Sequence, residues 1–331
     1  MRNNMKEKMR ILIAYDGSDH AGDAIMDLEL AGIPNEVEAT VLTVSDTWGL
    51  PDAMDRVSAS SGRFVPSSTR RIQSHLSHLK DQARTLAEIG AGRVSELFPD
   101  WNVKAEENLG KPAWEIIEKA DEWKADLIVV GSQGRSALGR ALLGSVSQKV
   151  LHESRCSVRI ARKRGENSTG STRVLVAVDG SAFAEAAVKT VAARSWPKDA
   201  EIRIIAVNDP FIHPAGGYVG WDTAEDQPED TEESRDWLEE MIETPKRVLR
   251  DAGIANVSHA IRWGDAGNMI LHEAEDWKAD SIFLGARGIG RFRRFLLGSV
   301  SSTVAARAIC SVEVIRLKEA TKHASKNNER N

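Results

Sequence analysis

The chain has few of the features that would place it in a membrane, in an oxidising compartment or on nucleic acid. None of its apolar runs approaches the roughly 20 residues needed to cross a bilayer, and its start, MRNNMKEKMR, lacks the apolar stretch of a signal peptide. Two cysteines, Cys156 and Cys310, are too few for a disulfide framework. A net charge of −5 gives no general attraction to nucleic acid. We expect a cytoplasmic protein without membrane or nucleic-acid partners.

The chain contains an internal repeat. RILIAYDGSDHA (10–21) matches RVLVAVDGSAFA (173–184) at an offset of 163 positions. Further along, WKAD (123–126) recurs at 277–280, at an offset of 154. The second copy is therefore nine residues shorter in between, and the 331 residues consist of a duplicated domain.

Composition shifts predict where the two copies begin and end. We expect a first domain at 1–161 and a second at 173–317. The join, 162–172, is polar and rich in Gly, Ser and Thr, which indicates a linker. The end of the chain, 318–331, is polar and reads as a frayed tail.

Short apolar runs alternate with helical patterns in both copies, which is typical of a parallel sheet covered by helices on both faces. Strands are predicted at 11–15, 37–44, 101–107, 127–131 and 157–161, and again at 174–178, 202–207, 257–262, 281–285 and 311–315. Helices are predicted in the first copy at 21–31, 71–97, 112–123 and 144–153. The first and fourth strands of each copy are almost wholly apolar, as central parallel strands are.

A glycine pattern follows the fourth strand of each copy. The stretches are GSQGRSALGRALLGSVS (131–147) and GARGIGRFRRFLLGSVS (285–301). Each has a glycine, two residues, a second glycine, nine residues and then Gly-Ser. In α/β folds, ligands bind beyond the carboxyl ends of the strands, which is where these stretches start.

The residue types suit a phosphate. Gly131 and Gly134 can take a positive φ or let a ligand approach the backbone. Gly144 and Ser145 open a helix, whose first N–H groups are unpaired and carry a positive dipole. Asp16, at the end of the first strand, can accept hydrogen bonds from a sugar or a base.

Each element also has a plainer interpretation. A lone G-x-x-G is usually a tight turn, Asp-Gly-Ser is a common turn that caps a helix, and Ser145 alone reads as a helix cap. His75 and His78, three residues apart on a predicted helix, could chelate a metal but are more typical of a solvated face. The joint recurrence of the glycine pattern in two copies favours a nucleotide site.

With these motifs in place, the sequence resembles the universal stress protein family in its tandem two-domain form. The family's ATP-binding branch carries the pattern G-2x-G-9x-G-[ST]. Both copies match it in full, with Gly131, Gly134, Gly144 and Ser145 in the first and Gly285, Gly288, Gly298 and Ser299 in the second.

The resemblance implies two Rossmann-like domains of the adenine nucleotide alpha hydrolase type. Each would have a five-stranded parallel sheet of order 3-2-1-4-5 with helices on both faces. It also implies that the copies pair through their fifth strands as a pseudo-dimer within the chain, and that two chains form a homodimer.

The resemblance further implies roles for particular residues. Asp16 and Asp179 would contact the ribose or the adenine, and Val44 and Val207 would contact adenine through their backbone. Val130 and Leu284 would line the pocket. Further backbone N–H groups of the phosphate cradle would come from Val146, Ser147, Val300 and Ser301. ATP is the implied ligand, with Mg or Mn on its phosphates.

The predicted function is ATP binding in a stress response or in signalling, without assigned catalytic or metal-ligating residues. No histidine falls in either glycine stretch, and the Walker pattern G-x-x-x-x-G-K-[ST] is missing. Two alternatives stay open at this point. One is a slow Mg- or Mn-dependent ATP hydrolase, and the other is an interaction module whose nucleotide sites are vestigial.

Overall fold

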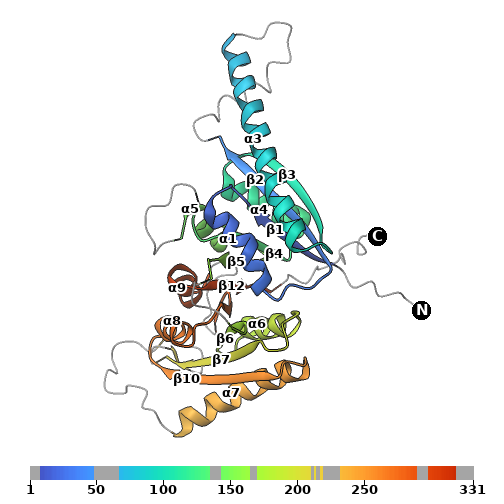
Figure 1. Ribbon diagram of the computed structural model, residues 1–331. Helices are drawn as coiled ribbons and strands as arrows, with labels where there is room; N and C mark the ends of the chain where they lie inside the picture. Colours follow the sequence, from blue (N-terminus) through green and yellow to red (C-terminus); the bar gives the residue numbers. More distant parts are fainter. Residues whose placement is uncertain are drawn as a thin grey trace, which may run out of the picture.

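The two copies join edge to edge into one continuous sheet (Figure 1). The computed structural model describes residues 8–47, 67–134, 143–164, 170–209, 212–213, 217–218, 232–288 and 297–317. Over these residues the large sheet has ten strands in the order β10-β7-β6-β11-β12-β5-β4-β1-β2-β3. Each half has the predicted order 3-2-1-4-5, so the predicted α/β fold is confirmed.

The first copy supplies one half of the sheet and its covering helices. Its strands are β1 (Met9–Ala14), β2 (Val37–Asp46), β3 (Asn102–Gly110), β4 (Leu127–Gly131) and β5 (Ser157–Ala161). Its helices are α1 (Asp19–Asp27), the 3-10 turn η1 (Leu28–Leu30), α3 (Ser67–Leu97), α4 (Pro112–Trp123) and α5 (Ser145–Glu153). All strand pairs within this copy are parallel.

The second copy repeats this arrangement. Its strands in the large sheet are β6 (Arg173–Val178), β7 (Glu201–Asn208), β10 (Asn256–Trp263), β11 (Ser281–Gly285) and β12 (Ser311–Ile315). Its helices are α6 (Ala182–Ala192), α7 (Glu232–Asp251), α8 (Ala266–Asp276) and α9 (Ser299–Arg307). A short hairpin, β8 (Ile212–His213) with β9 (Gly217–Tyr218), was not predicted.

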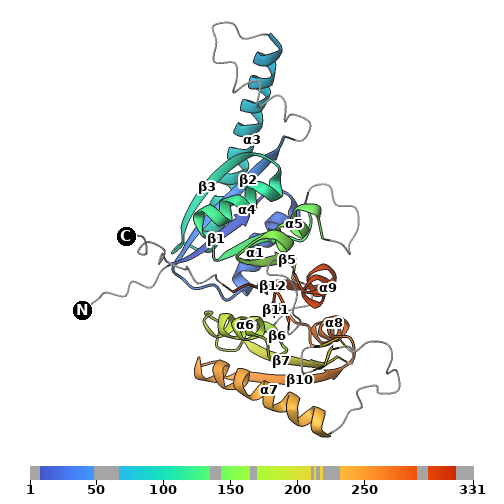
Figure 2. The ribbon, with the colours of Figure 1, turned by 180° about the vertical axis from the view of Figure 1, so that it is seen from behind.

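Several predicted element ends needed correction. The helix predicted at 21–31 starts earlier, because the Ser18 hydroxyl accepts a hydrogen bond from the backbone N–H of Ala21 and caps α1. It also ends earlier and tightens into η1. Helix α3 begins at Ser67, and its amino-terminal half extends beyond the sheet in both views (Figures 1 and 2). The predicted tail at 318–331 and the linker residues 165–169 lie outside the described residues.

The repeated WKAD motif ends a helix and anchors the next strand. Lys124 and Lys278 both take a left-handed conformation with φ of 56°, which terminates the preceding helix. The aspartate of each motif accepts a backbone hydrogen bond at the start of β1 or β6. Asp126 accepts one from the N–H of Arg10 at 2.8 Å, and Asp280 accepts one from the N–H of Arg173 at 2.9 Å. The repetition of this motif therefore has a structural explanation.

The two faces of the sheet are packed differently. On one face, α4, α5, α8 and α9 cover a single apolar core that runs through both copies and includes Val150 and Val304. On the other face the core is split, with one part under α1 and α3 and the other under α6 and α7. The gap between these two parts lies where β5 meets β12.

Strands β5 and β12 pair in the antiparallel direction, and we call this pairing the seam. Val312 lies opposite Ile160, Glu313 opposite Arg159 and Val314 opposite Val158. The valines and isoleucine join the shared apolar core. Because side chains alternate between faces along a strand, Arg159 and Glu313 point to the opposite face, into the gap between the split cores.

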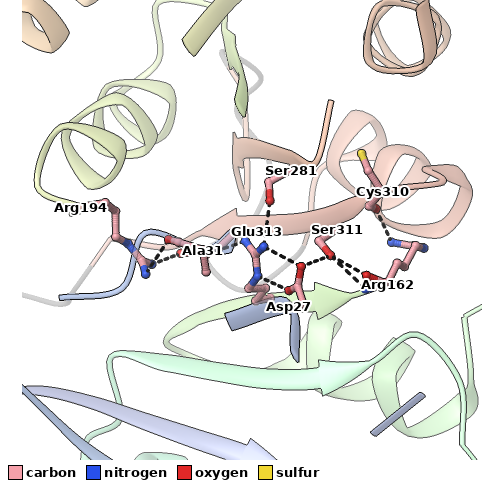
Figure 3. Close-up of polar contacts among 9 residues, drawn as sticks. Asp27, Ala31, Arg162, Arg194, Ser281, Cys310, Ser311 and Glu313 are labelled. Atoms are coloured by element: carbon pink, nitrogen blue, oxygen red, sulfur yellow. Dashed lines mark hydrogen bonds and ion pairs between the residues drawn. The ribbon is translucent and has the colours of Figure 1, made fainter. Parts of the chain in front are cut away.

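That gap holds a buried ionic network (Figure 3). The Arg159 guanidinium, fully buried, donates to both carboxylate oxygens of Asp27, at 2.6 Å and 3.0 Å. It also donates to Glu313 at 3.3 Å and to the Ser281 hydroxyl at 2.8 Å. Glu313 forms a second ion pair, with Arg194. Every charge in this gap therefore has a partner of opposite sign, which burial demands.

The charges alternate along this network. Asp27, Arg159, Glu313 and Arg194 follow one another as acid, base, acid and base. Burial alone lowers the pKa of Arg159, but the charges and hydrogen bonds of Asp27 and Glu313 outweigh it and raise that pKa. The central pair crosses the seam, so the network ties the two copies together.

We predict that Arg159→Met destabilises the protein by about 3–5 kcal/mol, because it leaves two buried carboxylates without their shared cation. Urea unfolding followed by circular dichroism measures the change. Lys189→Met, which breaks an exposed ion pair with Glu185 on α6, is the control and should leave the midpoint nearly unchanged. An Arg159→Met midpoint equal to that of the control would show that the network does not stabilise the seam.

The cysteines lie in the packed interior. Both are free thiols, with Cys310 buried and Cys156 half-buried. Burial raises the pKa of each thiol to about 12.

Among the described helices, none has the length and apolarity required to span a membrane.

Because the thiolate is the reactive form, we predict that neither cysteine reacts quickly with a thiol reagent at about pH 8 in the folded protein. Both should react in denaturant, where the pKa returns to its ordinary value. Absorbance of the released chromophore counts the reacted thiols. Fast reaction of Cys156 in the native chain would show that it is accessible and ionised.

Candidate functional site

In each copy the structure brings the predicted residues together where two neighbouring strands end. Strand β1 pairs with β4, and β6 pairs with β11, so the residues after these strands lie side by side. We call these two groups the glycine junctions. The first comprises Asp16, Gly131, Gly134, Gly144 and Ser145, and the second Asp179, Gly285, Gly288, Gly298 and Ser299.

Each aspartate supports the turn that leads into the following helix. Asp16 Oδ1 accepts a hydrogen bond from the backbone N–H of Ser18 at 3.0 Å, and Asp179 Oδ1 accepts one from Ser181 at 3.0 Å. Ser18 and Ser181 in turn cap α1 and α6. The plainer interpretation of Asp-Gly-Ser is therefore correct in part: one aspartate oxygen stabilises the turn, and the serine caps the helix.

The first glycine of each junction packs directly against a helix. A Cβ added to Gly131 would lie 2.7 Å from the carbonyl oxygen of His20, at the start of α1. A Cβ on Gly285 would lie 2.6 Å from Cβ of Phe183 in α6. No side chain fits at either distance, so these glycines let the helix approach the strand end.

The second glycine leaves room for the aspartate. The Oδ2 atom of Asp16 lies 3.1 Å from where a Cβ on Gly134 would be, and Oδ2 of Asp179 lies 2.5 Å from the same position on Gly288. The glycine loop and the aspartate are thus held in contact. The second carboxylate oxygen faces the loop in both copies.

The third glycine brings the helix start against the loop. The backbone N–H of Gly144 donates to the Ser132 carbonyl at 2.9 Å, and that of Gly298 donates to Ala286 at 2.8 Å. A Cβ on Gly144 would lie 3.3 Å from the Cα of Gln133, which is tighter than ordinary contact.

The hydroxyl at the third helical residue is occupied by the fold. Ser147 Oγ donates to the Gly131 carbonyl at 2.7 Å, and Ser301 Oγ donates to Gly285 at 2.6 Å. These hydroxyls hold the loop onto the helix and do not donate elsewhere. What they leave for a ligand is their backbone N–H groups.

The helix starts themselves face outward. Ser145 and Ser299 are exposed, and no side chain caps α5 or α9. The first backbone N–H groups of each helix, including those of Val146 and Val300, have no acceptor within their own helix. This end carries the positive pole of the helix dipole.

The junction glycines do not use the left-handed backbone conformation. For Gly131 and Gly134 we expected either a positive φ or a close approach of a ligand to the backbone, and none of the six junction glycines has a positive φ. Positive φ occurs instead in the Asp-Gly-Ser turns, at Gly17 with 77° and Gly180 with 78°. The Asp-Gly-Ser repeat carried this signal, because glycine follows the aspartate in both copies.

The valines and the leucine predicted to meet the base lie at different depths. Val44 and Val207 are partly buried on the shared core face, just past the last residue at which β2 pairs with β1 and β7 with β6. Val130 and Leu284 are almost fully buried in that core. Their side chains pack beneath the junctions.

The sequence did not single out two arginines that border the junctions. Arg162 and Arg316 follow β5 and β12, 154 positions apart, so the repeat offset could have found them. Burial lowers the pKa of both, and the positive charge of Arg287, in the second glycine loop, lowers that of Arg316 further. Arg287 also lies over the Phe183 ring, 5.2 Å from its centre.

The described residues contain no group of three or more His, Cys, Asp or Glu side chains that could hold a metal ion. His75 and His78 both lie on the amino-terminal half of α3, which projects beyond the sheet, and His78 Nε2 lies 3.0 Å from Gln82 Nε2. Mg²⁺ commonly binds through one carboxylate together with substrate phosphates. Oδ2 of Asp16 or Asp179 fits that mode, in which the phosphates carry most of the coordination.

Comparisons with known proteins assign the two copies to a family. The model of the universal stress protein family matches residues 8–162 and again 170–316, and the chain therefore belongs to that family. A curated relative from Staphylococcus epidermidis, named after the universal stress proteins, is 33% identical over 147 residues. This covers 44% of the present chain and 84% of the relative.

Solved structures show the same tandem fold. A universal stress protein from Archaeoglobus fulgidus superimposes with a TM-score of 0.62 at 25% identity, over 93% of this chain and 98% of that one. A Pseudomonas aeruginosa protein of 15% identity has a TM-score of 0.54 over 95% of both chains, which shows likeness of fold alone.

We predict that Gly131→Ala destabilises the protein by about 1–3 kcal/mol, because the added methyl group forces the loop and α1 apart. Gly92→Ala is the matched control. Gly92 is exposed in α3 with nothing near its Cβ position, so alanine should stabilise by about 0.5–1 kcal/mol. Thermal unfolding compares the two. Equal melting temperatures for Gly131→Ala and the unmodified chain would refute the close-packing role.

Proposed function

We propose that this universal stress protein binds ATP at both glycine junctions and acts through nucleotide occupancy in a stress response or in signalling. The observation that carries the proposal is the near-identity of the two junctions. Equivalent hydrogen bonds in the turn, the loop and the helix start occur in both copies. Each copy keeps its own cradle, although the two differ elsewhere.

The phosphates would bind at the starts of α5 and α9. Backbone N–H groups at Ser145, Val146 and Ser147 point along the helix axis, and the dipole favours negative charge there. The Ser145 hydroxyl is exposed and adds a further donor. Equivalent groups in the second copy come from Ser299, Val300 and Ser301.

The nucleoside would bind between the aspartate and the end of the second strand. Pairing between β1 and β2 ends at Ala14 with Leu42, so β2 runs on past it through Val44. Beyond Leu42, the edge of β2 that faces β1 has no β1 residue paired with it. Its backbone groups can therefore recognise an adenine edge. Oδ2 of Asp16 would accept a hydrogen bond from the ribose or the base.

The junctions favour binding over fast catalysis. Position 20 of the first copy is a histidine and the matching position 183 is a phenylalanine, so the two junctions share no acid–base side chain there. Mg or Mn would accompany the phosphates and neutralise their charge.

We further propose that two chains form a homodimer. Because β5 and β12 are paired to each other within the chain, a second chain would use another surface.

We predict that Ser145→Glu and Ser299→Glu each remove one of two ATP sites. Glutamate at the first helical position stabilises a helix, so the fold should persist. Its carboxylate would lie where the phosphate binds and would repel the phosphate. Isothermal titration with Mg–ATP measures the number of sites. Ser145→Gln and Ser299→Gln are the neutral controls and should retain both.

The alternatives give different results in the same preparation. Steady release of inorganic phosphate, lost in the glutamate variants, would indicate a hydrolase. Failure of the unmodified chain to bind ATP would refute the proposal and favour an interaction module.

A further inference from the structure

Each helix that starts at a glycine junction is held at its other end by an arginine of the opposite copy. Arg316, just after β12, donates through Nη2 to the carbonyls of Leu151 at 2.7 Å and His152 at 3.3 Å. These carbonyls lie in the last turn of α5, whose first turn belongs to the first junction.

The reciprocal contact is made by Arg162, just after β5. Its Nη2 donates to the carbonyl of Ala305 near the end of α9 at 2.5 Å, and its Nη1 donates to the Cys310 carbonyl at 3.3 Å. Figure 3 shows Arg162 beside Ser311 and Cys310, with dashed lines to both. Helix α9 starts at the second junction. The two arginines are related by the repeat offset, as are the helices they hold.

The backbone of each arginine is anchored across the seam as well. The N–H of Arg316 donates to the Ser157 hydroxyl at 3.2 Å, and the N–H of Arg162 donates to the Ser311 hydroxyl at 2.9 Å. Each arginine therefore sits in a fixed place between the copies. The last carbonyls of a helix have no partner within it, and a guanidinium satisfies them and complements the negative dipole end.

Each arginine also adjoins the glycine loop of its own copy. The residue before Arg162, Ala161, accepts a hydrogen bond from Ser132 in the first loop at 3.1 Å. The residue before Arg316, Ile315, accepts one from Ala286 in the second loop at 2.8 Å. A displacement of either loop would thus reach the helix of the other junction through one arginine.

We propose that Arg316 is a positioning residue for the first junction and Arg162 for the second, so that the two sites are coupled crosswise through the seam. The consequence for nucleotide affinity rests on the proposed function. The positioning itself concerns α5 and α9 and can be measured without nucleotide.

The experiment uses the full chain in two single-site backgrounds. Ser299→Glu leaves the first site and Ser145→Glu leaves the second. Arg316→Gln and Arg162→Gln are placed in each background, and Mg–ATP affinity is measured by titration. We expect Arg316→Gln to weaken the first site about fivefold, the scale of one lost hydrogen bond, and to change the second site less. Arg162→Gln should give the mirror image.

Other patterns of affinity would overturn the proposal. Equal weakening of both sites by either variant would indicate general destabilisation. Stronger weakening of the site in the arginine's own copy would show that it serves the adjacent loop.

Hydrogen exchange on the nucleotide-free chain separates this proposal from the function it rests on. Arg316→Gln should speed amide exchange in α5 more than in α9, and Arg162→Gln should do the reverse. If neither single-site background binds ATP, the proposed function fails, and a crosswise exchange pattern still supports the positioning role. Unchanged exchange in both helices would overturn it.

Discussion

The buried row of charges across the seam is the constraint on which the rest of the structure depends. Arg159 and Glu313 are opposite each other on β5 and β12, and each has a second partner in its own copy. Sliding either strand by one residue would turn its charge into the apolar core on the other face and leave the opposite charge without that partner. Unpaired, they would cost more than the seam gains from its apolar contacts. The network thus fixes how the two copies meet, and with it the positions of the loops that follow β5 and β12.

The glycine junctions show how one sequence pattern can serve folding and binding together. Because these glycines have no side chain, the start of α1 packs against Gly131, the Asp16 carboxylate against Gly134 and the loop backbone against Gly144. These close approaches place a carboxylate and a helix start beside each other. The glycine pattern is therefore required first for packing. That packing leaves the N–H groups at the start of α5 free to bind a ligand.

Most of the fold could be predicted because its signals are local and occur twice. Apolar runs such as 127–131 and 281–285 matched their strands to the residue, and the repeat fixed the equivalence of the copies. The ionic network could not be predicted, because Arg159 and Glu313 look like ordinary surface charges in alternating strands. The pattern predicted which residues the fold brings together at the junctions, but not which segments their glycines would contact, since close approach between distant segments leaves no local trace.

The equivalence of positions 159 and 313 has a consequence for how such a chain can evolve. In a pair of identical subunits, a residue on the two-fold axis faces its own copy, so a charge there always meets its like. Once the two copies are fused, each can change alone, and an arginine can come to face a glutamate. The divergence is then hard to reverse. Any exchange that made the two halves alike again would bring two arginines or two glutamates together in a space closed to water.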